Sequence, residues 1–290
     1  MKKYISLITI ILVVLTLFNG CTIAVINEDK KMQEEKEVFS VDEAQDEVES
    51  VDDESEEPSN ETVLPVSDVH TYVVETEEAE TVAPDGTVLA TYSCSYPVFE
   101  ANKGDDVECI AKINKLLRDN ALGTVSGLEE EYEALVEEYE NSKNYEYKFI
   151  PYEYDYDFEI HTNAKGVISF TEIWYAYLGG VHGMSGRESH TYDVVEGKEL
   201  SLSDLLYGTE EEIIAAFTNE FLKVSDEFYP GTDPAEVVPA EFSEAQYYVD
   251  SEGVTAYFQE YHVGPYASGF ISATVSDKEM LKYDFSDTEN

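Results

Sequence analysis

The stretch from Tyr152 to Ile160 alternates apolar and acidic side chains without interruption. Successive side chains of a β-strand point to opposite faces, so this period of two predicts a strand with all its aromatics on one face. The apolar positions are Tyr152, Tyr154, Tyr156, Phe158 and Ile160, and the acidic ones are Glu153, Asp155, Asp157 and Glu159. A turn at residues 163–166 and an apolar run at 167–177 then predict an antiparallel hairpin.

Helices and further strands are predicted on both sides of this hairpin. One helix is expected from residue 105 to about 120, ended by Gly123, and a second after the capping-box pair Ser126 and Glu129. A third is expected at 209–223, and Pro230, Gly231 and Pro234 should break the chain. The remaining strands are expected at 91–99, 187–194, 198–202, 247–249, 254–261 and 270–275. The predicted fold class is α+β, with antiparallel hairpins packed with about three helices.

The N-terminal twenty residues have the features of an export signal. Two lysines precede an apolar run at residues 5–18, which is shorter than a comfortable bilayer span. Gly20 and Cys21 follow, and they resemble the lipobox of bacterial lipoproteins, although Phe18 replaces the usual leucine. We therefore expect a signal peptide at 1–20, lipidation of Cys21 and anchoring on the extracytoplasmic face of a bacterial membrane. The alternative is an ordinary secretory signal.

Residues 21–90 are predicted to be a disordered acidic tether. Residues 22–91 hold 22 acidic and 3 basic side chains, and high charge with few apolar residues cannot offset the entropy of ordering. The tether would act as a spacer or, alternatively, attract cations. Residues 92–290 hold a further 41 acidic and 12 basic side chains, so the predicted domain at 91–290 is acidic itself. This charge argues against nucleic acid as a partner. The domain has two candidate subdomains, at 91–162 and 163–285.

Two loop segments are candidate binding regions. The first, residues 175–183, places three glycines around His182 at the end of a strand, which allows close approach of a ligand. The second, residues 257–269, bends at Gly264-Pro265 and offers an aromatic lip for a sugar or a protein side chain. A structural turn and core packing are the respective alternatives. The candidate residues are Tyr175, Gly179, Gly180, His182, Gly183, Tyr261, His262 and Tyr266.

Catalytic motifs are absent from the sequence. It contains no His-Glu-x-x-His, Gly-x-Ser-x-Gly, P-loop or Gly-x-Gly-x-x-Gly pattern. A metal site that joins His182 and His190 has no spacing motif to support it. We therefore expect no enzyme activity, no metal and no cofactor.

Cys94 and Cys109 are candidates for a disulfide if Cys21 carries the lipid. A bridge would tie the first strand of the domain to its first helix and would contribute about 3 kcal/mol in the chain-entropy model. The alternative is two buried thiols, because Cys109 lies beside the apolar stripe of the helix.

The order of four segments resembles a known family over residues 92–280. These segments are the strand and helix at 92–122, Tyr177–Gly183, Gly197–Leu205 and Tyr261–Gly269. The family is the extracellular domain shared by RsiV-type anti-sigma factors and the non-catalytic part of PdaC-type peptidoglycan deacetylases. The resemblance implies an α+β module that binds lysozyme in the anti-sigma factors and accompanies a separate catalytic domain in the deacetylases. Because the sequence shows neither a sigma-binding segment nor a deacetylase motif, we expect only the binding module to carry over.

Three hypotheses follow, in decreasing order of support. The first is a surface lipoprotein that binds a cationic protein such as lysozyme, since an acidic domain attracts basic partners. The second is a module that binds cell-wall glycan through Tyr175, Tyr261 and Tyr266. The third is an enzyme that acts on wall glycan, with His182 as its best candidate residue.

Overall fold

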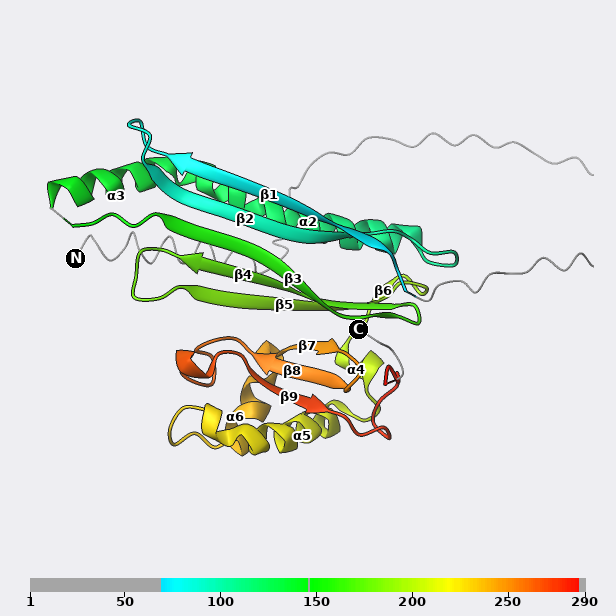
Figure 1. The fold of residues 1–290 in the computed structure, drawn as a ribbon. Coiled ribbons are helices and arrows are strands. Elements are labelled where there is room, and N and C mark those ends of the chain that lie inside the picture. Colours follow the sequence, from blue (N-terminus) through cyan, green and yellow to red (C-terminus); the bar gives the residue numbers. More distant parts are fainter. Residues whose placement is uncertain (1–68, 146, 287–290) are drawn as a thin grey trace, which may run out of the picture. The chain divides into compact units, whose positions relative to one another are not determined.

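The computed structural model describes residues 69–145 and 147–286 (Figure 1). These residues belong to one compact unit, Val66–Asn290. The predicted signal peptide, Cys21 and the tether up to residue 68 lie outside the described residues.

A six-stranded sheet forms the first layer (Figure 1). Its strands, in spatial and sequence order, are β1 (Tyr72–Val82), β2 (Val88–Phe99), β3 (Tyr152–Ala164), β4 (Val167–Tyr177), β5 (Met184–Asp193) and β6 (Lys198–Glu199). Strands β2 and β3 pair in parallel, and the other neighbours pair antiparallel. A parallel pair needs a long crossover, which α2 (Val107–Glu130) and α3 (Tyr132–Asn144) supply. The parallel pairing of β2 and β3 is a feature that the predicted antiparallel hairpins did not include.

A three-stranded antiparallel sheet forms the second layer. It contains β7 (Gln246–Val249), β8 (Val254–Phe258) and β9 (Ile271–Val275). The helices of this layer are α4 (Leu202–Leu205), α5 (Glu210–Phe221) and α6 (Pro234–Glu241), with short 3₁₀ helices η1 (Leu222–Glu227), η2 (Phe242–Glu244) and η3 (Tyr266–Ser268). Phe217 and Phe221 of α5 are fully buried in one core with Phe258 of β8. Among the described residues, none of the helices combines the length and hydrophobicity needed to span a bilayer.

The six-stranded sheet is covered on both faces near β3, β4 and β5. On one face, the Tyr92 hydroxyl of β2 donates to the carbonyl oxygen of Ala121 in α2. On the other face, Thr162 Oγ1 donates to the Val249 carbonyl oxygen at 2.7 Å, and Ser189 Oγ lies 2.7 Å from the Tyr257 hydroxyl. The two layers are therefore joined by buried polar contacts.

The α+β class and the central hairpin are confirmed. Tyr152, Tyr154 and Tyr156 are buried on β3, whereas Glu153 and Asp157 are exposed, as the period of two predicts. The turn is formed by Lys165 and Gly166, whose φ angles are 54° and 76°. Positive φ at both central residues matches the right-handed twist of the flanking strands.

Two predicted strands end early, at Glu199 instead of 202 and at Phe258 instead of 261, and three predicted helix ends or breaks also differ. Helix α2 continues past Gly123 to Glu130, because one glycine costs a helix only about 1 kcal/mol and does not end it. The helix start predicted at Ser126 is therefore wrong. The break predicted at Pro234 is also wrong, because Pro234 begins α6, where proline at the first turn loses no hydrogen bond.

The predicted tether is wrong for residues 72–90, which form β1 and the start of β2. Almost every β1 side chain is exposed, and four of its eleven residues are glutamates, so the segment has the composition of a disordered chain. It is ordered because its backbone pairs with β2 along its whole length.

The predicted bridge between Cys94 and Cys109 is absent, and both cysteines are buried free thiols. Helix α2 runs antiparallel to β2, because Asn114 bonds the Phe99 backbone while Ala121 accepts from Tyr92. Cys94 is five residues before Phe99 on the strand, about 16 Å of extended chain. Cys109 lies beyond the Phe99 end, so the sulfurs cannot meet.

We expect both thiols to be free and slow to react in the native protein. Burial raises the pKa of the Cys109 thiol, which lowers its thiolate fraction and its reactivity. Alkylation with iodoacetamide, followed by mass spectrometry, should label Cys94 and Cys109 only after denaturation, without prior reduction. If the denatured protein were labelled only after addition of a reductant, Cys94 and Cys109 would be joined in a disulfide, and the prediction of two free thiols would be wrong.

Candidate functional site

Two connections meet at one end of the two sheets (Figure 1). The first follows β4 and runs from Leu178 to Gly183, and the second follows β8 and runs from Gln259 to Phe270. Gly179 has φ of 77° and the Tyr177 hydroxyl donates to the Gly180 carbonyl oxygen at 2.9 Å, which folds the first connection back on itself.

His182, Tyr261 and Tyr266 form an aromatic cluster between these connections. The His182 ring stacks on Tyr266 with centroids 4.0 Å apart, and the two tyrosine rings are 5.5 Å apart. His182 Nδ1 lies 2.7 Å from the Gly183 carbonyl oxygen and therefore donates to it. In the neutral imidazole Nε2 then accepts from the Tyr261 hydroxyl at 3.2 Å. Both ring nitrogens are used, so His182 is fixed in orientation.

Tyr175 extends the cluster along β4. Its ring covers Gly183, where an added Cβ atom would overlap the tyrosine unless that ring moved. Partial burial and then the negative charge of Glu153 raise the pKa of Tyr175. Asp155, which pairs with Tyr175 across the sheet, adds a second carboxylate beside the cluster.

The second connection and the neighbouring strand β7 are held in place by side chains that bond the backbone of β5. Gln259 Oε1 accepts from the Arg187 N–H at 3.1 Å, and Gln259 Nε2 donates to the Arg187 carbonyl oxygen at 2.5 Å. Glu260 and Gln246 accept from the N–H groups of Ser185 and Ser189, each at 3.3 Å. These contacts position Tyr261, which follows directly.

The structure places most of the predicted site residues together, with one exception. His262 points to a different neighbour, since its Nε2 lies 3.2 Å from Glu241 Oε2 and its ring stacks on Phe258. The cluster therefore joins His182, Tyr261, Tyr266 and Tyr175, with Gly179, Gly180 and Gly183 shaping the loop. A role of these residues in ligand binding remains a prediction.

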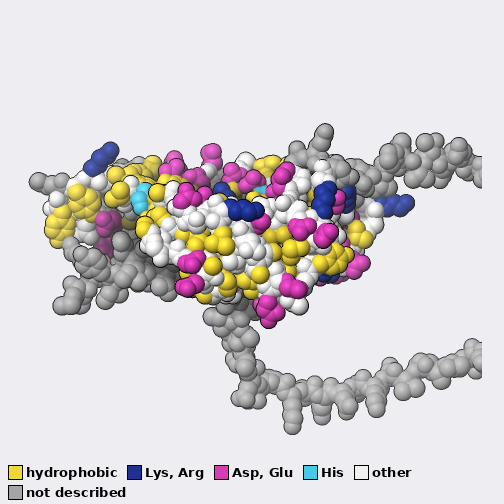
Figure 2. Space-filling view, turned by 90° about the horizontal axis from the view of Figure 1, so that it is seen from below, with side chains coloured by type: hydrophobic (Ala, Val, Ile, Leu, Met, Phe, Trp, Pro, Cys, Tyr) yellow, Lys and Arg dark blue, Asp and Glu magenta, His cyan; other side chains and the backbone are white. Residues whose placement is uncertain are grey.

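Val181 is a surface feature that sequence reasoning missed. Its side chain is completely exposed at the tip of the first connection, next to His182. An apolar side chain between Gly180 and His182, in a glycine-rich loop, was the available signal. Figure 2 shows acidic side chains dispersed over one face of the molecule with apolar side chains exposed between them.

A second group of chemically active side chains lies on the face of the six-stranded sheet that α2 covers. It consists of Glu172 on β4 and Glu188 and His190 on β5. Burial opposes protonation of His190, but the carboxylates of Glu172 and Glu199 outweigh it and raise the pKa of His190 to about 9. The metal site considered for His182 and His190 is not seen in the described residues. His182 contacts Tyr261 and Tyr266, whereas His190 faces Glu172, Glu188 and Glu199.

Comparisons with known proteins assign most of the described chain to two family models. Residues 85–185 match the model described as "Deacetylase PdaC", and residues 208–278 match "Protein of unknown function (DUF3298)". A solved structure of a DUF3298 family member from Bacteroides fragilis is similar, with 15% identity and a TM-score of 0.58, over 76% of this chain and 96% of that chain. A DUF3298 family protein from Pseudomonas aeruginosa matches with 17% identity and a TM-score of 0.43, over 73% of this chain and 95% of that chain. No curated protein matches the chain.

Proposed function

This chain combines a PdaC domain with a DUF3298 domain, the architecture of PdaC- and RsiV-type proteins, and from that premise we propose that it is a non-catalytic binding protein of the bacterial cell envelope. The two domains are associated with the envelope, and neither has an established catalytic role in this chain. The proposal places the protein on the extracytoplasmic face of the membrane, held by a lipid on Cys21. Its partner is a cationic protein such as lysozyme, bound at the aromatic cluster.

The observation that supports a protein partner most directly is the surface composition around the cluster. Tyr261 is about half exposed (47%), and the fully exposed Val181 precedes His182, which contacts Tyr261. Tyrosines with an apolar neighbour are typical of the centre of a protein interface. Glu153, Asp155 and Glu260 lie nearby, and carboxylates beside aromatic rings suit lysine and arginine side chains.

The charge of the whole chain supports the same class of partner. It carries 63 acidic and 17 basic residues, and such a field accelerates association with a basic protein at low salt. Charge alone gives weak binding that salt removes, whereas contacts at the cluster should persist at physiological salt.

Replacement of Tyr261 by alanine is expected to weaken lysozyme binding at least tenfold, about 1.4 kcal/mol, at physiological salt. The measurement is calorimetric titration of residues 66–290 with lysozyme at low and physiological salt. Tyr207→Ala is the matched control, because Tyr207 is similarly exposed (58%) and follows α4, at the other end of the sheets in Figure 1. Equal loss in both variants, or binding that disappears at physiological salt, would contradict recognition by the cluster.

The alternative is a glycan-binding module, in which Tyr261 and Tyr266 would stack on sugar rings. A pull-down on purified peptidoglycan distinguishes glycan binding from binding of a cationic protein. Retention on the wall that Tyr261→Ala abolishes, without lysozyme binding in solution, would favour glycan.

A further inference from the structure

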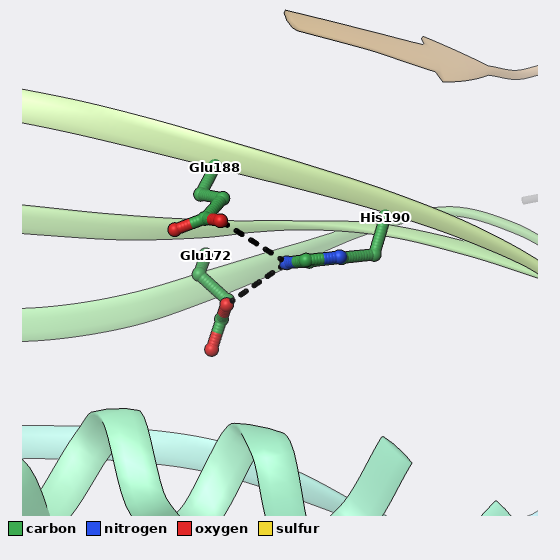
Figure 3. A group of neighbouring side chains, drawn as sticks. All are labelled: Glu172, Glu188 and His190. Atoms are coloured by element: carbon green, nitrogen blue, oxygen red, sulfur yellow. Dashed lines mark ion pairs between the residues drawn. The ribbon is translucent and has the colours of Figure 1, made fainter. Parts of the chain in front are cut away.

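Glu172, Glu188 and His190 come from two neighbouring strands of the six-stranded sheet. Glu172 and Glu188 are directly opposite one another in the β4–β5 pairing, and His190 is two residues beyond Glu188 and so on the same face. Figure 3 shows the two carboxylates on either side of the imidazole tip. One ligand atom from each residue lies within 4.8 Å of the other two.

The Nε2 atom of His190 points at both carboxylates and forms ion pairs with them (Figure 3), without a hydrogen bond. It is buried and lies 3.4 Å from Glu172 Oε2 and 3.9 Å from Glu188 Oε1. These separations are long for a hydrogen bond. They are close to the spacing of ligands around a tetrahedral metal, about 3.3 Å for bonds of about 2.0 Å.

The other nitrogen of His190 is already occupied. Nδ1 lies 2.9 Å from Glu199 Oε1 on β6, which orients the ring and directs Nε2 toward the two carboxylates. A carboxylate on the far nitrogen of a histidine is the usual support of a metal-ligating imidazole.

Glu172 is also held in place. It is buried on β4, and both its oxygens accept from Asn120 Nδ2 of α2, at 3.1 and 3.0 Å. The Tyr156 hydroxyl donates to Oε1 as well. Two carboxylates directly opposite one another repel. His190 offsets this repulsion only at ion-pair distances of 3.4 and 3.9 Å, and a divalent cation bound to all three side chains would offset it at bonding distance.

We propose that Glu172, Glu188 and His190 bind a divalent first-row transition metal of the Zn²⁺ type, with Glu199 as the positioning residue for the imidazole. One imidazole nitrogen and two carboxylates suit Zn²⁺ better than Ca²⁺ or Mg²⁺, which prefer oxygen ligands throughout. The metal would join β4 to β5 and would act as a structural ion.

The test is titration of the untagged full chain with Zn²⁺ in competition with a chromophoric chelator. We expect one site, and the Glu188→Gln variant should weaken it at least tenfold. Glu188 is partly exposed, so this variant should fold, and circular dichroism checks that it does. His190→Ala should also lose the imidazole signature in X-ray absorption of the zinc-loaded protein.

His262→Ala is the matched control. His262 pairs with a single carboxylate, Glu241, at 3.2 Å and should leave the tight site unchanged. No site of about one zinc per chain, or a site that survives both Glu188→Gln and His190→Ala, would overturn the proposal. Tighter binding of Ca²⁺ or Mg²⁺ than of Zn²⁺ would overturn it too.

Discussion

A domain that begins at Val88 is expected to aggregate, whereas one that begins at Val66 is expected to remain monomeric. The shorter form lacks β1 and leaves the edge of β2 unpaired. Strand β2 contains the buried residues Leu89, Tyr92, Cys94 and Tyr96, and a long apolar edge is a template for pairing between copies. The glutamates of β1 now protect this edge.

The form that begins at Val88 should lose more stability than the hydrogen bonds between β1 and β2 provide, because it also lacks His70. His70, just before β1, is almost completely buried (2%) and its N–H donates to Asn163 Oδ1 at 2.9 Å. Asn163 Nδ2 donates back to the His70 carbonyl oxygen at 2.8 Å, and His70 Nε2 lies 2.9 Å from Asp105 Oδ2. Removal of His70 leaves Asn163 and Asp105 without these partners, which costs about 1–3 kcal/mol for each buried group.

Size-exclusion chromatography and circular dichroism of the two forms make the comparison. The His70→Ala variant of the longer form distinguishes the contribution of the His70 side chain from that of strand β1. It should lower the stability without causing aggregation. A monomeric, equally stable form that begins at Val88 would show that β1 is dispensable.

The sequence-based prediction succeeded for elements whose structure follows from a local pattern of side chains. It failed for elements whose structure depends on pairing with a strand distant in the sequence. The alternation at Tyr152–Ile160 needs only the period of a strand, so β3 and its hairpin with β4 were predictable. Strand β1 is acidic on both faces, and only β2 makes it a strand. The parallel pairing of β2 and β3 likewise depends on where α2 and α3 return the chain.

The same distinction holds for the sites. The glycines around His182 and the aromatics near Tyr261 marked two unusual loops, but only the fold shows that they touch. Glu172 and Glu188 are separated by the whole β4–β5 hairpin, and no spacing motif links them. Their proximity follows from the register of β4 against β5.

Acidification is expected to destabilise the protein through His161. This side chain of β3 is buried between the layers, with its ring stacked on Tyr248 of β7 at 3.6 Å and its Nε2 2.7 Å from Thr171 Oγ1. Burial, and then the positive charge of Arg187 on β5, lower the pKa of His161 to about 4. The histidine is therefore neutral in the folded protein near neutral pH.

The direction in which stability changes with pH follows from the uptake of a proton by His161 on unfolding. The unfolded chain binds a proton at its ordinary pKa of about 6.5, whereas the folded protein resists it until about pH 4. The stability is fully present above about pH 6.5 and falls as the pH decreases toward 4. The loss through this one group is about 3 kcal/mol by pH 4, since each pH unit is worth about 1.4 kcal/mol.

Chemical denaturation of residues 66–290 and of the His161→Phe variant, between pH 7 and pH 4, measures this contribution. Phenylalanine keeps a ring against Tyr248 and cannot bind a proton, so the variant should lose about 3 kcal/mol less than the wild type over this range. Carboxylates also titrate here, and the comparison cancels them because both proteins contain the same set. If His161→Phe follows the same curve as the wild type, the junction between the layers does not oppose protonation of His161.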